Sequence, residues 1–212
     1  MNGSGNRYQE LIAIALRSLD NTGQLPHSLQ ELAALAEVPQ SEIEEVFPSI
    51  LLLRGGLINH GLALLAEDIR QGVVAADPAN PCAQIKALAR AYFTWGSMHR
   101  ALFRVMASAL FDPEIAASSD FDLHRNSIRN LMEKKLHESQ SLGQIPADRD
   151  LGVVMANLHA VVLGISSMLT QGRLDPWYKG PVTDTEELAL MMIEAFLEQT
   201  IPYEAAIRNQ PE

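Results

Sequence analysis

The spacing of apolar residues between Ser28 and Phe47 constrains the fold more than any other feature of the chain. This stretch reads SLQELAALAEVPQSEIEEVF. Its first half forms one helical stripe, made of Leu29, Leu32, Ala33 and Ala36, and its second half repeats at spacings of three and four, at Ile43, Val46 and Phe47. Two short helices joined by a tight turn do not bury both stripes by themselves. The sequence therefore predicts a helix-turn-helix packed on a further helix.

Local signals indicate where these helices begin and end. Ser28 followed by Glu31 has the spacing of a capping box at the start of the first helix. The Pro48-Ser49 pair ends the second helix. An amphipathic segment from Tyr8 to Leu19 supplies the helix against which the pair packs. The N-terminal part of the chain is therefore predicted to form a three-helix bundle.

This bundle is acidic. Its second short helix carries Glu42, Glu44 and Glu45 and no Lys or Arg. Residues 1–70 hold four basic against nine acidic residues, a net charge of −5, and the whole chain has a net charge of −10. These charges provide no general attraction to nucleic acid or to an anionic membrane, because binding to phosphates depends on Lys and Arg. The three glutamates are either a solvated helix face, which the helix dipole stabilises slightly, or a specific acidic binding surface.

Helical spacing continues to the end of the chain. We expect a long helix over residues 50–75, disturbed at Gly55-Gly56, and a stop at the proline-rich residues 77–81. Later helices are expected around residues 85–95, 102–110, 121–139, 151–170 and 186–200, the last one opened by a second capping box of Thr183 with Glu186. Helices account for all the apolar runs, so the predicted fold class is all-α.

The segment Leu151–Thr170 contains no Asp, Glu, Lys or Arg and resembles a membrane span in composition. It holds an Asn, a His, two serines and two glycines, and it lacks a basic flank, so we interpret it as a buried helix. A helix that is apolar on nearly all sides needs cover on nearly all sides, which favours contact with a second subunit. The N-terminal MNGSGNRYQE has no apolar core of a signal peptide, and Cys82 is the single cysteine, so a cytoplasmic protein without a membrane partner is expected.

The N-terminal pattern resembles that of the TetR family of bacterial regulators. An alanine-rich first helix, a second helix of the SLQELAALA type and a third helix ending in Phe before Pro-Ser are typical of this family. The matching scaffold positions here are Leu29, Ile43, Phe47, Pro48 and Ser49, together with Ala13, Ala15 and Gly23. The resemblance implies a three-helix helix-turn-helix domain at residues 1–49, a connecting helix at about 50–75, and a larger helical ligand-binding and dimerisation domain at 76–212.

The chain differs from the family at positions that face DNA. Glu37 replaces the usual Gly after the second helix, and Pro39 replaces the Ser or Thr cap. Further along, Glu44 replaces the Tyr that touches phosphate, and the remaining departures are Ser41 for Gly, Val46 for His and Ile50 for Lys. We therefore expect DNA affinity to be weak or lost. If DNA does bind, phosphate contacts are expected from Arg7, Arg17 and Arg54, and the residues nearest the bases are Gln40, Ser41 and Glu42.

The resemblance also implies a homodimer and a cavity for an effector. In the family the last two long helices pair with their counterparts in a second subunit; the expected interface residues here are Val154, Leu158, Val161, Val162, Ile165, Leu188, Met191, Met192, Ala195 and Phe196. Aromatic and Met side chains suit a mostly apolar small molecule. The expected ligand contacts are Tyr92, Trp95, Met98, His99, Phe103, Met106, Met132, His159 and Met168. Ordinary core packing explains the same aromatic and Met stripes, so this alternative stays open.

We find no sequence pattern for catalysis, a cofactor or a metal. The chain lacks a glycine-rich phosphate loop, a nucleophile elbow and a Cys-x-x-Cys pair. Its six histidines are not spaced like metal ligands. Two functions remain. The first is a ligand-responsive transcriptional regulator that binds DNA as a dimer, and the second is a dimeric small-molecule or protein binding module that keeps the helix-turn-helix only as a scaffold.

Overall fold

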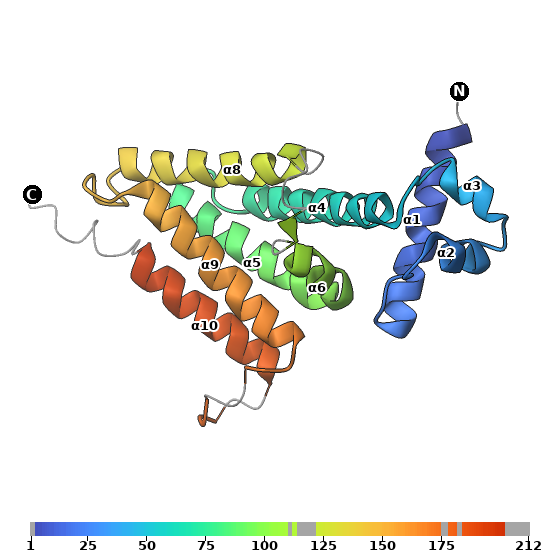
Figure 1. Ribbon diagram of the computed structural model, residues 1–212. Helices are drawn as coiled ribbons and strands as arrows, with labels where there is room; N and C mark the ends of the chain where they lie inside the picture. The colour runs from blue at the N-terminus through green and yellow to red at the C-terminus, as the bar shows by residue number, and fades with distance from the viewer. Residues whose placement is uncertain (1–2, 110–111, 114–121, 175–177, 182–183, 202–212) are drawn as a thin grey trace, which may run out of the picture. The chain divides into compact units, whose positions relative to one another are not determined.

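The computed structural model describes residues 3–109, 112–113, 122–174, 178–181 and 184–201. In these residues all regular secondary structure is helical, which confirms the predicted all-α class (Figure 1). The helices are α1 (Gly3–Thr22), α2 (Leu29–Ala36), α3 (Gln40–Glu44), α4 (Ile50–Ala75), α5 (Pro81–Met98), α6 (Arg100–Ala109), α8 (Asp122–Ser141), α9 (Leu151–Thr170) and α10 (Thr185–Thr200).

The chain forms two compact units. The first contains the described residues of Met1–Leu62 and Ala101–Asp122, and the second contains those of Ala63–Arg100 and Leu123–Glu212. Helix α4 contributes its first half to one unit and its second half to the other, and α6 belongs to the first unit although it follows α5 in the chain. The division at residues 49 and 76 that the sequence suggests stays a prediction.

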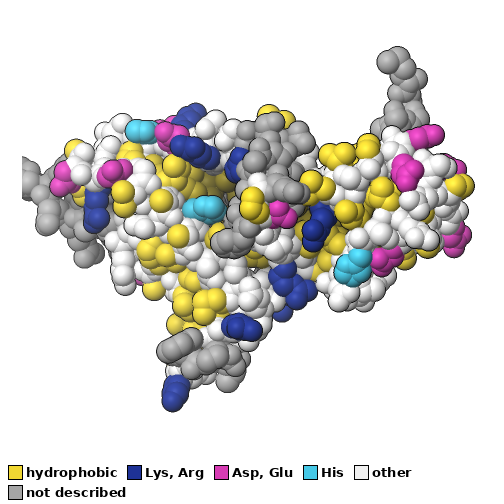
Figure 2. Space-filling model, in the orientation of Figure 1, with side chains coloured by type: hydrophobic (Ala, Val, Ile, Leu, Met, Phe, Trp, Pro, Cys, Tyr) yellow, Lys and Arg dark blue, Asp and Glu magenta, His cyan; other side chains and the backbone are white. Residues whose placement is uncertain are grey.

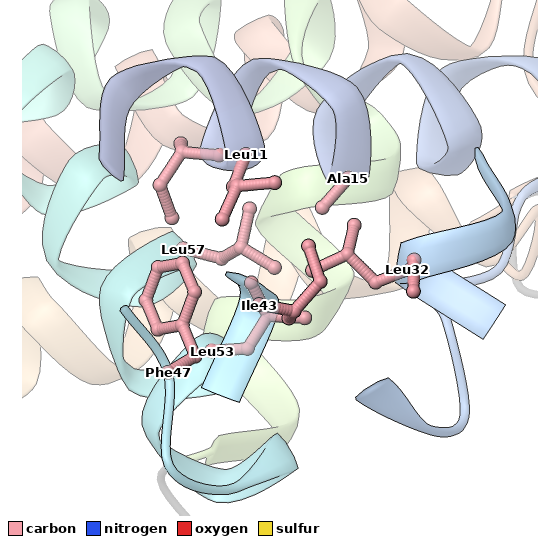
Figure 3. Packing of buried hydrophobic residues seen from close by; sticks show 9 residues of the cluster. Leu11, Ala15, Leu32, Ile43, Phe47, Leu53 and Leu57 are labelled. Atoms are coloured by element: carbon pink, nitrogen blue, oxygen red, sulfur yellow. The ribbon is translucent and has the colours of Figure 1, made fainter. Parts of the chain in front are cut away.

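The core of the first unit is the apolar cluster expected from the sequence (Figure 3). Side chains from α1, α2, α3 and the start of α4 point toward one another, and the buried members are Leu11, Ile12, Ala15, Leu32, Ala33, Ile43, Phe47, Leu53 and Leu57. The Tyr8 ring packs on Phe47, with ring centroids 5.1 Å apart. Each fully buried Leu, Ile or Phe contributes about 1.5–3 kcal/mol to folding, so this cluster holds α1, α2 and α3 together.

The turn between α2 and α3 has left-handed backbone at the position where TetR-family sequences usually have glycine. Glu37 lies in the left-handed region at φ 55°, and its N–H is bonded back to the end of α2. At the other end of α2, the Ser28 Oγ accepts a hydrogen bond from the Glu31 N–H at 3.1 Å. The predicted capping box is therefore half formed, because the Glu31 carboxylate accepts from the His27 N–H at 2.8 Å rather than from Ser28.

Helix α4 runs without interruption through Gly55-Gly56, where the sequence suggested a disturbance. The reason at Gly56 is close packing rather than a bend. A Cβ at this position would lie 2.7 Å from the Tyr8 Oη and 3.2 Å from the Phe47 ring. Glycine thus lets α4 approach α1 within the first unit.

Helix α5 packs against α9 and α10 in the second unit. Arg90 of α5 pairs with Glu194 of α10, and Arg100, at the start of α6, pairs with Glu186 at the start of α10. The earlier of the two arginines pairs with the later of the two glutamates, so α10 runs antiparallel to α5. Figure 1 shows α9 running in the same direction as α5 and antiparallel to α10.

Side-chain caps define several helix starts in the second unit. Asn80 caps α5, and Asp150 caps α9 by accepting from Gly152 and Val153 N–H groups. The cap of α10 is Asp184, whose carboxylate accepts from the Glu186 N–H at 2.8 Å. The sequence suggested Thr183 for this role, but Thr183 lies outside the described residues.

Two helices of the described chain, α4 and α9, are long and apolar enough to cross a membrane by length and composition alone. Core helices of globular proteins pass the same test. Each is only partly buried within this chain. The exposed apolar part of α9 is considered below.

Candidate functional site

Helix α3 presents an acidic face. Ile43 is buried, whereas Glu42, Glu44 and Glu45 are exposed. Pro39 precedes the helix with extended backbone and makes no side-chain cap. The Gln40 amide donates to the Glu44 carboxylate at 2.7 Å. The exposed surface of this helix therefore consists of carboxylates, a hydroxyl and an amide that is already hydrogen-bonded.

The predicted phosphate contact Arg7 pairs with two acidic residues, Glu10 on its own helix α1 and Glu42 on α3. Its guanidinium lies 2.8 Å from the Glu10 carboxylate and 3.0 Å from the Glu42 carboxylate, and its side chain is 25% exposed. The hydrogen bond that Arg7 donates to Glu10, together with the negative charges of Glu10 and Glu42, raises the pKa of Arg7. Binding a phosphate would require this arginine to leave both carboxylates.

The other predicted DNA contacts are exposed in the first unit. These residues are Arg17 on α1, Gln40, Ser41 and Glu42 on α3, and Arg54 on α4. Figure 2 shows acidic side chains gathered over the region of α1 to α3 on the face in view. The structure brings Arg7 and Glu42 together, and it leaves the surface of α3 without a basic residue of its own.

The predicted ligand contacts differ in burial and do not all belong to one unit. Phe103 and Met106 lie on α6 in the first unit, and the remaining seven lie in the second. Among those seven, Trp95 and Met132 are buried, Tyr92 and Met168 are half-buried, and Met98, His99 and His159 are exposed. Met98 is 72% exposed, so its side chain lies at the surface of α5 rather than in its core.

Two ring contacts connect the predicted ligand residues of the second unit. The Tyr92 ring meets the His159 ring edge to face, with centroids 6.5 Å apart, and so links α5 to α9. Trp95 packs on His99 at 5.0 Å. Burial raises the pKa of Tyr92 and lowers the pKa of His159. Both shifts favour the uncharged form of the side chain at neutral pH.

Sequence reasoning missed several buried polar residues in the second unit. In the described part of the chain, the buried polar side chains are Asn80, Gln84, Ser139 and Ser166. Gln144 connects to Asn80 and to the Cys82 N–H. By contrast, Gln84 Oε1, Trp95 Nε1 and Ser166 Oγ have no protein hydrogen-bond partner in the described part. A polar residue inside an apolar stripe was the signal available in the sequence, and Ser166 in the last third of α9 fits it.

The predicted dimer residues fall into two groups. Val154, Leu158, Val162, Ile165 and Leu188 are buried within the single chain. Met191, Met192 and Ala195 are exposed, and Val161 and Phe196 are half-buried. A different stripe of α9 faces outward, and it contains the exposed residues Gly152, Val153, Ala156 and Ala160. Figure 2 shows hydrophobic side chains over α9 and α10 on the face in view.

Comparison with known proteins gives matches at the level of structure alone. The sequence matches no protein-family model and no curated protein. Among solved structures, a protein of unknown function from Rhodococcus sp. RHA1 is similar with a TM-score of 0.74 and 23% identity, over 92% of this chain and 95% of that chain.

Two further structures are similar over nearly their whole length. One is a bacterial regulatory protein of the tetR family from Rhodococcus RHA1, with a TM-score of 0.65 and 16% identity, over 95% of this chain and 98% of that chain. The other is AibR in complex with isovaleryl coenzyme A and operator DNA, with a TM-score of 0.63 and 16% identity, over 93% of this chain and 99% of that chain.

Proposed function

Because the chain has the fold of TetR-family regulators, we propose that it is a ligand-responsive transcriptional regulator of that type, which works as a homodimer and binds DNA weakly or not at all. In this proposal residues 1–49 form the domain on the DNA side, and residues 76–212 form the ligand-binding and dimerisation domain. The observation that carries it is the helix-turn-helix whose exposed α3 is acidic and whose nearest arginine, Arg7, is paired with Glu42.

The similar structures support the regulatory part of the proposal. AibR shares this fold and has been solved with an acyl coenzyme A and operator DNA. We infer a small-molecule effector and duplex DNA as partners here too; the effector is expected to be mostly apolar and the affinity for DNA to be weakened. A regulator of this kind acts in the cytoplasm and needs no catalytic residue, metal or cofactor of its own.

Electrostatics supports the weakened affinity for DNA. Each Lys or Arg placed on a phosphate releases counterions and contributes about 0.9 to the salt dependence of binding. On this surface, Arg7 already neutralises two carboxylates, and Glu42, Glu44 and Glu45 would face the phosphates. Arg17 and Arg54 are the remaining candidates for phosphate contacts. One glutamate can accept a hydrogen bond from cytosine, but three on one short helix repel the backbone.

The exposed stripe of α9 supports the homodimer. Gly152, Ala156, Ala160 and Gly164 recur every four residues, and a Cβ on Gly164 would meet no atom within 4 Å of this chain. Small residues at this spacing let two helices approach closely. Next to them, α10 exposes Leu190, Met191 and Met192, which are 37–49% accessible. A contiguous apolar surface of this kind is costly to leave in water, and a second copy presents the same surface across a two-fold axis.

Variants on this stripe test the homodimer. We expect Ala156→Arg and Ala160→Arg each to convert the protein to a folded monomer, because a buried unpaired guanidinium at the centre of an interface is strongly unfavourable. Asn130→Arg, at an exposed position of α8, is the matched control and should leave the dimer intact. Size-exclusion chromatography with light scattering gives the mass directly. A monomeric wild type, or α9 variants that stay dimeric, would contradict the proposed interface.

The same acidic surface favours the second candidate function, a dimeric binding module that keeps the helix-turn-helix only as a scaffold. Under this alternative the apolar cluster of the first unit is retained for stability, and the exposed glutamates do not oppose any function because the protein does not bind DNA. The two candidates differ in one measurable property, because the scaffold has no sequence-selective affinity for duplex DNA at any salt concentration.

A charge reversal on α3 tests the electrostatic argument. Glu44→Lys with Glu45→Lys should strengthen non-specific DNA binding and make it steeper in salt, because two repulsive carboxylates become two phosphate contacts. The matched control is Glu133→Lys with Asp148→Lys, which changes net charge equally at exposed positions of the second unit. Fluorescence anisotropy with a random duplex measures both. Equal binding by the α3 variant and the control would show that the position of the glutamates does not matter.

A further inference from the structure

The first turn of α4 exposes two adjacent leucines. Leu51 is 36% exposed and Leu52 is 47% exposed, whereas the next residue, Leu53, is fully buried. The Ser49 hydroxyl accepts a hydrogen bond from the Leu52 N–H at 3.3 Å, so a side-chain cap holds this turn. Single exposed apolar residues are ordinary on protein surfaces. A pair on one capped turn forms a small apolar surface that the first unit leaves in water.

This turn lies beside α3. The side chains of Ile43, Phe47 and Leu53 belong to the buried cluster of the first unit and point toward one another (Figure 3). Because α3 and the start of α4 pack together through these inner residues, their outer faces adjoin at the surface. Only a short connecting segment separates Glu45 from Leu51. The exposed residues therefore form one surface, called the α3–α4 surface, made of Glu42, Glu44, Glu45, Leu51 and Leu52.

The α3–α4 surface carries a negative charge that the chain neutralises only in part. Arg7 is shared between Glu10 and Glu42, and the group bonded to Glu44 is a neutral amide. With Glu45, one arginine stands against four glutamates, which leaves a net charge of −3. Protein docking surfaces commonly have an apolar centre and a charged rim, and the sign of the rim selects the charge of the partner.

The combination of leucines and carboxylates argues against three other occupants. Duplex DNA and an anionic membrane are repelled by the carboxylates, and leucine side chains donate no hydrogen bond to a phosphate. A second copy of this chain would meet the surface with the same acidic residues across a two-fold axis. The net charge of −10 gives that copy no general attraction to an acidic surface. The remaining match is a partner that is both apolar and basic.

We propose that the α3–α4 surface docks a basic amphipathic segment of another protein. Apolar side chains of this segment cover Leu51 and Leu52, and its Lys or Arg side chains pair with Glu44 and Glu45. This inference rests on the loss of DNA affinity proposed above, and it deepens the protein-binding alternative by giving it a surface and a class of partner. It uses none of the residues proposed for the homodimer.

A synthetic peptide serves as the probe for such a partner. It is a fluorescein-labelled helix former of about four turns, with leucine on one face and lysine on the other. A scrambled peptide of the same composition keeps the charge and lacks the apolar face. Fluorescence anisotropy with the full-length protein at about 50 mM salt gives both dissociation constants. We expect the patterned peptide to bind at least about fivefold more tightly, because it alone covers the leucines while pairing with the glutamates.

Charge reversal on α3 tests the electrostatic part of the proposal. Glu44→Lys with Glu45→Lys should weaken binding of the patterned peptide by at least about tenfold, because attraction becomes repulsion. The matched control is Glu133→Lys with Asp148→Lys, which changes the net charge equally at exposed positions of the second unit. The control should bind the peptide within about threefold of the wild type, because only long-range attraction is reduced.

Removal of the exposed leucines tests the apolar part. Leu51→Ser with Leu52→Ser should weaken peptide binding by at least about fivefold, because the peptide then covers hydroxyls instead of apolar surface. Serine is well tolerated at a helix start, so this variant should keep the fold. The control is Leu123→Ser with Leu142→Ser, at leucines that are 75% and 63% exposed in the second unit. It should change the affinity by less than about twofold.

Each contrary result overturns the proposal. Equal binding of the patterned and scrambled peptides would show that net charge alone attracts them. Variants of the α3–α4 surface that bind like their controls would place the contact elsewhere on the protein. Absence of binding would show that the surface accepts no such segment. The assay contains no DNA, so these results leave the proposed regulator function standing, whereas tight and selective DNA binding would contradict that function without changing the peptide measurements.

Discussion

Glu37 shows at the scale of one residue how the sequence and the fold disagree. It is the sole non-glycine residue with positive φ in the described part of the chain, and it occupies the turn between the two helices of the helix-turn-helix. An L-residue in this conformation costs about 1–2 kcal/mol. The chain keeps left-handed backbone at this turn without the glycine that adopts it most easily. The packing of the apolar cluster in the first unit must therefore offset the steric cost at Glu37.

Replacing Glu37 by Gly should stabilise the protein. Glycine removes the steric cost of the left-handed backbone, and its greater freedom in the unfolded chain offsets part of the gain, which leaves about 0.5–1 kcal/mol. Thermal unfolding followed by circular dichroism should show a melting temperature higher by about 1–4 °C. Glu37→Ala, which removes the carboxylate and keeps the Cβ, should not produce this increase. A lower melting temperature for Glu37→Gly would mean that the turn is not strained.

Residue-scale contacts were the least predictable from the sequence. From the sequence alone, Arg7 is expected to be available for a phosphate contact. Its pairing with Glu42 requires α1 and α3 to lie side by side, and this proximity depends on the packing of the bundle, which no local sequence pattern indicates. The departure at Glu37, by contrast, was predictable, because the spacing of the two apolar runs fixes where the turn must reverse.

At the scale of helices, packing decides what local sequence leaves open. Gly55-Gly56 suggests a disturbed helix, yet α4 is continuous because its core face is fixed by Leu53 and Leu57 on either side. Gly56 is small because Tyr8 and Phe47 lie against it. Helix bounds at 50–75 and 151–170 were predictable from proline, glycine and capping residues. The outward-facing stripe of α9 was not predictable. Because α9 has apolar residues on nearly all sides, its sequence does not indicate which side is buried within the chain and which is exposed.

Substitution of Gly56 tests the close approach of α4 and α1. Gly56→Val should destabilise the protein by about 1–3 kcal/mol, because its added carbons overlap the Tyr8 hydroxyl and the Phe47 ring. Chemical denaturation measures this loss as a lower midpoint. Ala34→Val, at an exposed position of α2, reports the small cost of a valine in a helix and is the control. Equal losses for the two variants would rule out the tight contact.

At the scale of the whole molecule, fold and charge lead to different expectations. The fold is similar to that of AibR, whose structure contains operator DNA, while the net charge of −10 and the acidic α3 oppose binding to DNA. The all-α class was predictable because every apolar run has helical spacing. The ring contact between Tyr92 and His159 was not, since these two residues are more than sixty positions apart in the sequence and are brought together only by folding.

The central claim is that this helix-turn-helix has lost most of its affinity for DNA while keeping its scaffold. The most direct measurement is fluorescence anisotropy of the wild-type protein with the DNA upstream of its own gene and with a random duplex, at about 50 and about 200 mM salt. We expect weak binding at the lower salt concentration, with the upstream DNA preferred over the random duplex, and none at the higher one; the absence of any preference would favour the scaffold alternative. Tight and sequence-selective binding at both would contradict the claim, and it would show that an acidic helix reads DNA on this fold.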